Sequence, residues 1–126
     1  MQHFLLVFVG AGLGGAFRHG INLLVARGWP NGIGVATLIE NVLGCFLMGV
    51  LVEVLALKTG ASQATRLFLM TGLLGGFTTF SAFALETVLL YERGAVGWAL
   101  VNVIASVTLS VLALVAGLWL VRQASG

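Results

Sequence analysis

The sequence predicts an all-α integral membrane protein with four transmembrane helices. Of its 126 residues, 60% are hydrophobic and only 8% are charged, and the mean hydropathy is +1.11. A soluble domain of this size could not bury that many apolar side chains, so the bilayer must act as their solvent. A helix that spans a bilayer takes roughly 20 apolar residues, so four spans use nearly the whole chain. We therefore expect a single membrane domain over residues 1–126.

Four apolar stretches supply these spans, and polar or turn-forming segments separate them. The stretches cover residues 4–26, 33–57, 67–90 and 96–121. The separating segments are RGWPNG at 27–32, KTGASQATR at 58–66 and YERG at 91–94. None is long enough for a separate domain. The first three residues carry no Lys or Arg, which predicts a permanent first span and no cleavable signal peptide.

The first span contains GAGLGG at 10–15, which matches the GxGxxG pattern of dinucleotide-binding proteins. Such a site needs the glycines after a strand and an acidic residue about 20 positions further on. Here the next acidic residue, Glu40, lies in the second span. The glycines are better interpreted as small residues that let helices approach closely in lipid.

Enzyme and nucleic-acid functions find no support in the composition. The chain has no Asp and only two His residues, so neither a Ser-His-Asp triad nor a metal cluster can form. Its single cysteine, Cys45, allows no disulfide within the chain. The Lys and Arg residues are scattered, whereas a nucleic-acid site needs them clustered. We expect neither catalysis nor nucleic-acid binding.

Positive charges in the loops do not choose one orientation in the membrane. Lys58, Arg66 and Arg122 fall on one side, and Arg27 and Arg93 fall on the other. This near balance is compatible with a weak preference for both termini inside. It is equally compatible with insertion in both directions, so that two copies pair as an antiparallel dimer.

The third span carries GGFTTFSAF at 75–83, where lipid favours leucine and valine. The two glycines lower helix propensity, and the hydroxyl groups that follow can replace lost backbone partners, so we expect a broken third helix. Irregular backbone at this depth must be covered by protein or water, which makes the break a predicted site. Its carbonyls could coordinate a hard cation, and its amides or helix N-termini could face an anion.

Side chains near the break favour an anion. Phe80 and Phe83 are three residues apart, so a helix places both rings on one face, where their positive edges form a weak anion seat. Asn41 adds two N–H donors without a full charge that would trap the ion.

The fourth span carries a polar stripe, because Asn102, Ser106 and Ser110 recur every four residues. This stripe could line a path for an ion. It could equally serve helix packing and hydrogen bonds to the preceding turn.

Taken together, these segments resemble the Fluc fluoride channels, also called CrcB-like proteins, over essentially the whole chain. The resemblance rests on GAGLGGAFRHG, ATLIENVLGCFLMG and GLLGGFTTFSAFALE in the first three spans, and on the spaced serines in the fourth. It implies an antiparallel, dual-topology homodimer in the bacterial cell membrane. Such a channel lets fluoride leave the cytoplasm passively and so reduces fluoride toxicity.

The resemblance also implies roles for individual residues. Gly75 and Thr78 would offer backbone carbonyls to a structural Na⁺ at the centre of the dimer. Arg18 would place positive potential at a vestibule that attracts anions. The fluoride pathway would be formed by Asn41, Phe80, Phe83, Thr79, Thr37, Asn102, Ser106 and Ser110.

Three residues depart from the family pattern. Asn102 stands where a tyrosine of the polar track is expected, and Ala82 replaces a threonine. Glu40 would repel fluoride if it were ionised and faced the pore beside Asn41. Because adjacent helical residues point about 100° apart, we expect Glu40 to face elsewhere, toward the dimer interface, or to be protonated.

Two other functions fit the same size and number of spans. A proton-coupled antiporter similar to the small multidrug resistance family needs an essential Glu in its first span, and residues 4–26 contain none. A non-transporting proteolipid subunit leaves GGFTTFSAF unexplained. A fluoride channel, and not an enzyme, is therefore the preferred prediction, with the antiporter as its alternative.

Overall fold

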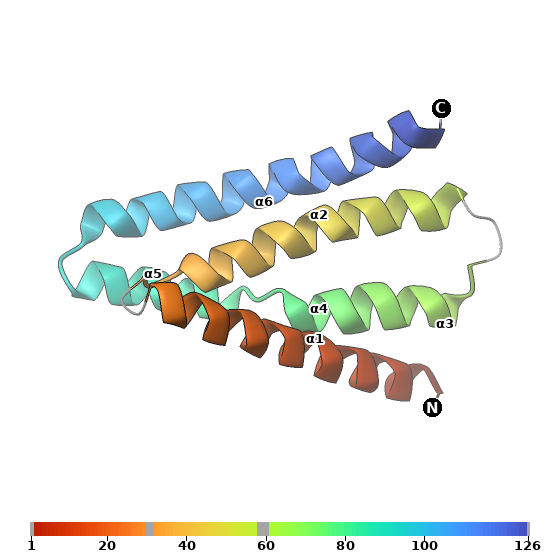
Figure 1. Ribbon diagram of the computed structural model, residues 1–126, viewed down its shortest axis with the longest axis horizontal. Coiled ribbons are helices and arrows are strands. Elements are labelled where there is room, and N and C mark those ends of the chain that lie inside the picture. The colour runs from red at the N-terminus through yellow and green to blue at the C-terminus, as the bar shows by residue number, and fades with distance from the viewer. Residues whose placement is uncertain (1, 30–31, 58–60, 126) are drawn as a thin grey trace.

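The computed structural model describes residues 2–29, 32–57 and 61–125, and all regular structure in that part of the chain is helical. Four long helical spans lie side by side in an elongated bundle (Figure 1). In chain order the elements are α1 (Gln2–Gly28), α2 (Val35–Leu57), α3 (Gln63–Arg66), the π-helix η1 (Leu67–Leu74), α4 (Gly75–Phe77), α5 (Ser81–Glu92) and α6 (Val96–Ser125).

Four helical segments of the described chain are long and apolar enough to cross a membrane, which confirms the predicted number of spans. Three of them are continuous α-helices, and the third in chain order is a composite of α3, η1, α4 and α5. Many large apolar side chains, such as Phe4, Phe8 and Trp98, are exposed on the surface of the single chain. This distribution is expected for helices whose solvent is lipid.

α1 packs against η1 and α4 at glycine positions. A Cβ atom on Gly10 would lie 2.8 Å from a backbone oxygen of η1, and one on Gly14 would overlap another. For Gly12 and Gly15 of the same GAGLGG segment, no atom from the other described helices lies within 4 Å of the Cβ positions. The predicted packing role is therefore confirmed for Gly10 and Gly14, which lie four residues apart on one helix face.

The most extensive packing joins α2 and α6. A Cβ atom on Gly49 would overlap a backbone oxygen of α6, and one on Gly117 would overlap a backbone oxygen of α2. Both glycines lie in the C-terminal halves of their helices. Close backbone contact therefore joins these halves, and the polar residues Asn41 and Ser106 lie in the other halves, next to α5.

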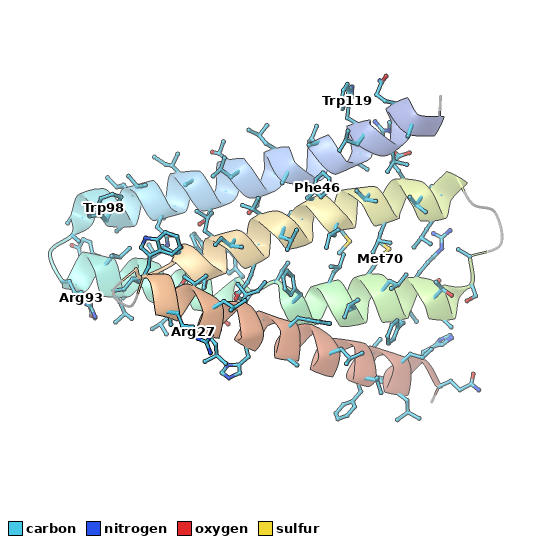
Figure 2. The ribbon with its side chains drawn as sticks, in the orientation of Figure 1. Arg27, Phe46, Met70, Arg93, Trp98 and Trp119 are labelled. Atoms are coloured by element: carbon cyan, nitrogen blue, oxygen red, sulfur yellow. The ribbon has the colours of Figure 1, made fainter. Side chains whose placement is uncertain are left out.

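The two chain ends lie at the same end of the bundle (Figure 1). Arg66 in α3 and Arg122 in α6 belong to that end. Figure 2 shows Arg27 and Arg93 together at the opposite end. Lys58, the remaining base of the predicted charge count, lies outside the described residues. Apart from Arg18, which lies within the first span, the described Lys and Arg residues thus lie two at each end.

Candidate functional site

The third span leaves helical geometry at residues 78–80, between α4 and α5. Thr78 has extended backbone with φ −87° and ψ 157°, and its N–H and its Oγ1 both donate to Leu74 O at 3.0 Å. At the start of α5, Ala82 N donates to Thr79 Oγ1 at 3.2 Å. The two threonine hydroxyl groups therefore satisfy backbone groups on each side of the interruption.

The two glycines on which the sequence argument placed the break, Gly75 and Gly76, both lie inside α4. A Cβ atom on Gly76 would overlap the backbone of Ala11 in α1. Gly76 therefore serves the close contact with α1. The non-helical residues are Thr78, Thr79 and Phe80, because the two threonine side chains and Asn41 supply alternative hydrogen-bond partners for the backbone there.

Asn41 reaches from α2 to this interruption. Its Nδ2 donates to Thr79 O at 2.9 Å, and its Oδ1 accepts from Thr79 N at 2.8 Å. One side-chain amide thereby satisfies both backbone groups of Thr79 and holds the non-helical segment in place. An amide nitrogen carries two N–H groups, so one donor of Asn41 remains for a ligand.

The interruption also redirects two N–H groups that would close helical turns. In an α-helix the N–H of a residue bonds the carbonyl four residues earlier, so Thr79 N would bond Gly75 O. Ala82 N would likewise bond Thr78 O. Because Asn41 and the Thr79 hydroxyl take these donors, Gly75 O and Thr78 O are left as acceptors. Carbonyl oxygens of this kind fit a hard cation such as Na⁺.

The Arg18 side chain lies beside the same interruption, on α1. Its Nε donates to Gly76 O at 3.3 Å, at the C-terminal end of α4 where the helical carbonyls carry negative partial charge. Arg18 is not among the residues that line the cavity next to Asn41. The positive charge of Arg18 therefore lies beside the interruption of the third span but outside the lining of the cavity.

A cavity of about 310 Å³ lies beside the interruption, between α2, α5 and α6. Cys45 of α2 is one of the residues that line this cavity. Phe83 is buried in its wall, whereas 77% of Phe80 is exposed. The two ring centroids are 5.4 Å apart, and the ring planes meet at 54°. Seven of the predicted site residues line the cavity together: Asn41, Thr78, Thr79, Phe80, Phe83, Ser106 and Ser110.

The stripe on α6 divides between two environments. Asn102 Nδ2 donates to Thr87 Oγ1 at 2.9 Å, and Ser106 Oγ donates to Asn102 Oδ1 at 3.5 Å. Ser110 Oγ is buried without a hydrogen-bond partner among the described residues, although Cys45 lies close enough to interact with it. Ser106 and Ser110 face the cavity, whereas Asn102 lines a separate one near the start of α2.

The chain matches the family described as "CrcB-like protein, Camphor Resistance (CrcB)" over residues 5–118. It belongs to the CrcB-like protein family. Among its relatives, the fluoride-specific ion channel FluC of Granulibacter bethesdensis is 57% identical over 122 residues, 97% of this chain and 96% of that one.

Two further relatives carry the same description. The fluoride-specific ion channel FluC 2 of Nitrobacter hamburgensis is 51% identical over 97% of this chain and 98% of its own length. FluC of Rhodopseudomonas palustris is 52% identical over 94% and 96%, respectively. The family recognised from the sequence is thus confirmed. With four spans and bacterial relatives named as ion channels, this CrcB-like chain is a multi-pass membrane protein and not an enzyme.

Two features of α2 in this CrcB-like chain differ from the sequence-based prediction. Thr37 is buried and does not line the cavity; its Oγ1 donates to Glu86 Oε2 at 2.7 Å, which ties α2 to α5. Cys45 does line the cavity. Cys45 lies four residues after Asn41 and so shares its helix face, a signal that could have revealed its place in the lining, whereas the bond from Thr37 to Glu86 depends on another helix and has no such signal.

Glu40 is fully enclosed within the CrcB-like chain. Only 1% of it is exposed, and neither carboxylate oxygen has a hydrogen-bond partner among the described residues. It does not line the cavity beside Asn41, as the angle between adjacent helical residues led us to expect. Because it is buried inside one chain, Glu40 does not lie on an outer face available to a second copy.

Proposed function

We propose that the chain is a fluoride-selective ion channel that exports F⁻ passively from the cytoplasm. Its family membership supports this function, as do relatives that are named fluoride-specific ion channels over nearly their whole length. Within the chain, the proposal rests on the cavity where the Asn41 amide, the phenylalanine pair and the serines of α6 meet. The proton-coupled antiporter finds no support in these relatives.

The lining of the cavity suits a small anion that must give up water. Asn41 and Ser110 provide N–H and O–H donors that replace hydrogen bonds the hydrated ion loses, and Ser106 would add a third if its O–H turned from Asn102 Oδ1 toward the ion. None of the described lining residues is charged. The ion therefore meets donors of moderate strength and is able to leave again, as conduction requires.

The phenylalanines and the start of α5 add positive partial charge to the same region. The edges of aromatic rings carry positive partial charge. Because the ring planes of Phe80 and Phe83 meet at 54°, the edge of one ring can point in the direction that the face of the other ring points. α5 begins at Ser81, so its N-terminal end, which carries positive partial charge, lies next to the interruption. Both contributions favour an anion while the apolar rings exclude water.

The end of α4 has the opposite preference and would hold the structural Na⁺. Its C-terminal end carries negative partial charge, and Gly75 O and Thr78 O have lost their helical donors to Asn41 and to the Thr79 hydroxyl. When bound, the ion supplies positive charge that holds these carbonyls together. Arg18, bonded to Gly76 O, adds positive charge nearby and would attract anions toward the region.

A homodimer would complete the site, with the two copies antiparallel in the lipid bilayer. Phe80 lines the cavity yet is 77% exposed, and Gly75 is exposed as well, so a second copy would cover both. The loop bases of the sequence divide three against two between the two sides, a difference too small to favour one orientation strongly.

Ion efflux from liposomes tests the function directly. Liposomes that contain the purified protein are loaded with fluoride or with chloride, and valinomycin is added so that K⁺ balances the charge. Ion-selective electrodes should report rapid loss of fluoride and retention of chloride. If both anions leave at one rate, selectivity is refuted; if neither leaves, the channel proposal fails, and proton-coupled cation transport is the next assay.

Exchange of the cation tests the Na⁺ site. A ligand that binds only the folded protein stabilises it by mass action, so the thermal midpoint should be higher in NaCl than in N-methylglucamine chloride at equal ionic strength. The difference should grow with the Na⁺ concentration. An identical midpoint in both salts, at every concentration, would count against a structural Na⁺.

A further inference from the structure

Glu40 combines complete burial with an unsatisfied carboxylate, and the fluoride pathway proposed above makes no use of it. It lies in α2 directly before Asn41, with 1% of its surface exposed. Both carboxylate oxygens are buried and lack a hydrogen-bond donor among the described residues. Oε1 of Glu86 is likewise buried with no hydrogen-bond partner in the described part of the chain.

Few charged groups face Glu40 from the helices packed around α2. Arg18 on α1 and Glu86 on α5 are close enough to act on it electrostatically. η1 and α4 contain no titratable side chain, and the only one on α6 is Arg122, which pairs with Glu53 at the other end of α2. Elsewhere on α2 the titratable side chains are Cys45 and Glu53.

Neither neighbour can stabilise an ionised Glu40 well. The Nε of Arg18 donates to Gly76 O, and no Arg18 nitrogen bonds the Glu40 carboxylate. Glu86 adds a charge of the same sign. An ionised carboxylate that is buried without donors is among the most unfavourable groups in a protein interior, whereas the neutral acid is much less costly to bury.

We infer that Glu40 is a proton-binding site whose proton is required for fluoride conduction. The step is COO⁻ + H⁺ → COOH on Glu40, and no other reactant takes part. Without that proton, a full negative charge lies one residue from the Asn41 amide that donates to the anion, in a region where charges interact strongly. Raising the pH removes the proton, so fluoride flux should fall as the pH rises.

The role in conduction rests on the proposed fluoride function, and the pH dependence of flux tests it. Fluoride efflux from proteoliposomes is measured from mildly acidic to mildly alkaline pH, with equal pH on both sides. The flux of the unaltered protein should fall by about tenfold or more across this range. E40Q should hold the acid-limit flux at every pH, and E40D should retain a pH-dependent profile. E53Q, an acid of α2 far from the cavity, should show the unaltered profile.

Infrared spectroscopy of the same samples detects the proton without relying on flux. The unaltered protein and E53Q should show the C=O stretch of a neutral carboxylic acid at neutral pH, and E40Q should lose it. If E40Q does not fold, the band in the unaltered protein must still disappear with rising pH in parallel with the flux. A flat flux profile, or a band unchanged in E40Q, overturns the inference. If no variant conducts at any pH but the band behaves as expected, the channel proposal fails while the proton site stands.

Discussion

The third span meets its neighbours in two different ways. Along η1 and α4 it contacts α1 so closely that Cβ atoms on Gly10 and Gly14 would reach or overlap its backbone. Around residues 78–80 and α5 it leaves a cavity of about 310 Å³ with α2 and α6. The closed contact is built from glycines, and the open one from Asn41, Phe83 and Ser106, side chains that fill some of the space and line the rest.

This difference shows how one helix can be both anchored and interrupted. Glycine gives backbone contact over a short distance and leaves no room for an ion. Polar side chains hold the neighbouring segments apart and supply the partners that the interrupted backbone needs. Gly76 is held from α1, through Ala11 and Arg18, and Thr79 is held from α2 by Asn41. The segment between them is thus constrained on both sides.

The largest expected effect comes from the open contact, with Asn41→Asp. The carboxylate removes the donor to Thr79 O and places a negative charge where fluoride would bind. On insertion scales, a charged residue at the centre of a membrane span costs roughly 2.5–3.5 kcal/mol. An increase of this size in the free energy of the ion in the pathway corresponds to a decrease in flux of about a hundredfold. Liposome efflux measures the loss, and an unchanged elution volume shows that the variant is folded. Normal flux from Asn41→Asp would remove this residue from the pathway.

The closed contact is tested by Gly14→Ala against Gly12→Ala, two changes in the same GAGLGG segment. A Cβ atom on Gly14 overlaps η1, so this variant should lose about 1–3 kcal/mol of stability. No atom from the other described helices lies within 4 Å of the Cβ position of Gly12, so its replacement should be neutral or slightly stabilising. Thermal unfolding in detergent compares the two. Equal effects would show that the spacing within GAGLGG does not determine the packing.

Phe80→Ile separates a role in conduction from a role in folding. Because 77% of Phe80 is exposed in the chain, its loss should leave the fold intact, yet the ring edge beside the cavity disappears. Aromatic pair energies correspond to a decrease in flux of up to about tenfold. Phe8→Ile on α1 is the matched control, since Phe8 is also 77% exposed and lies outside the cavity lining. A similar decrease in both variants would argue for a general effect of exposed aromatic residues.

The smallest effect is expected far from both contacts, with Arg122→Gln. Arg122 Nη2 lies 2.7 Å from Glu53 Oε1, but 61% of the arginine side chain is exposed. An exposed ion pair contributes less than about 1 kcal/mol, so the thermal midpoint should shift only slightly and the flux should not change. A clear loss of fluoride flux would show that conduction depends on this end of the bundle as well.

Part of the candidate site could be predicted from the sequence, because some of its geometry is local. The spacing of Phe80 and Phe83 on α5, and of Ser106 and Ser110 on α6, follows from helical periodicity. The exact point of interruption could not be predicted in the same way. Gly75 and Gly76 are the weaker helix formers, yet they remain in α4, and the chain leaves the helix where Asn41 of another helix takes over the backbone bonds.

Contacts between different helices likewise decided which polar side chains bond one another. Thr37 lies on the same face of α2 as Asn41, but its hydroxyl donates to Glu86, and Thr37 does not line the cavity. Asn102 continues the stripe of Ser106, but it lines another cavity and bonds Thr87. Both outcomes depend on side chains from a different helix, which periodicity within one helix does not contain.

By itself, the sequence determined that the chain forms four apolar helices, because hydropathy and length depend only on the order of residues and on the thickness of the bilayer. Only the tertiary structure decided which side chains share a cavity, which carbonyls lose their helical donors, and that Glu40 is enclosed with no hydrogen-bond partner among the described residues. Burial and hydrogen bonding are properties of neighbouring helices, and they exist only once the helices have packed.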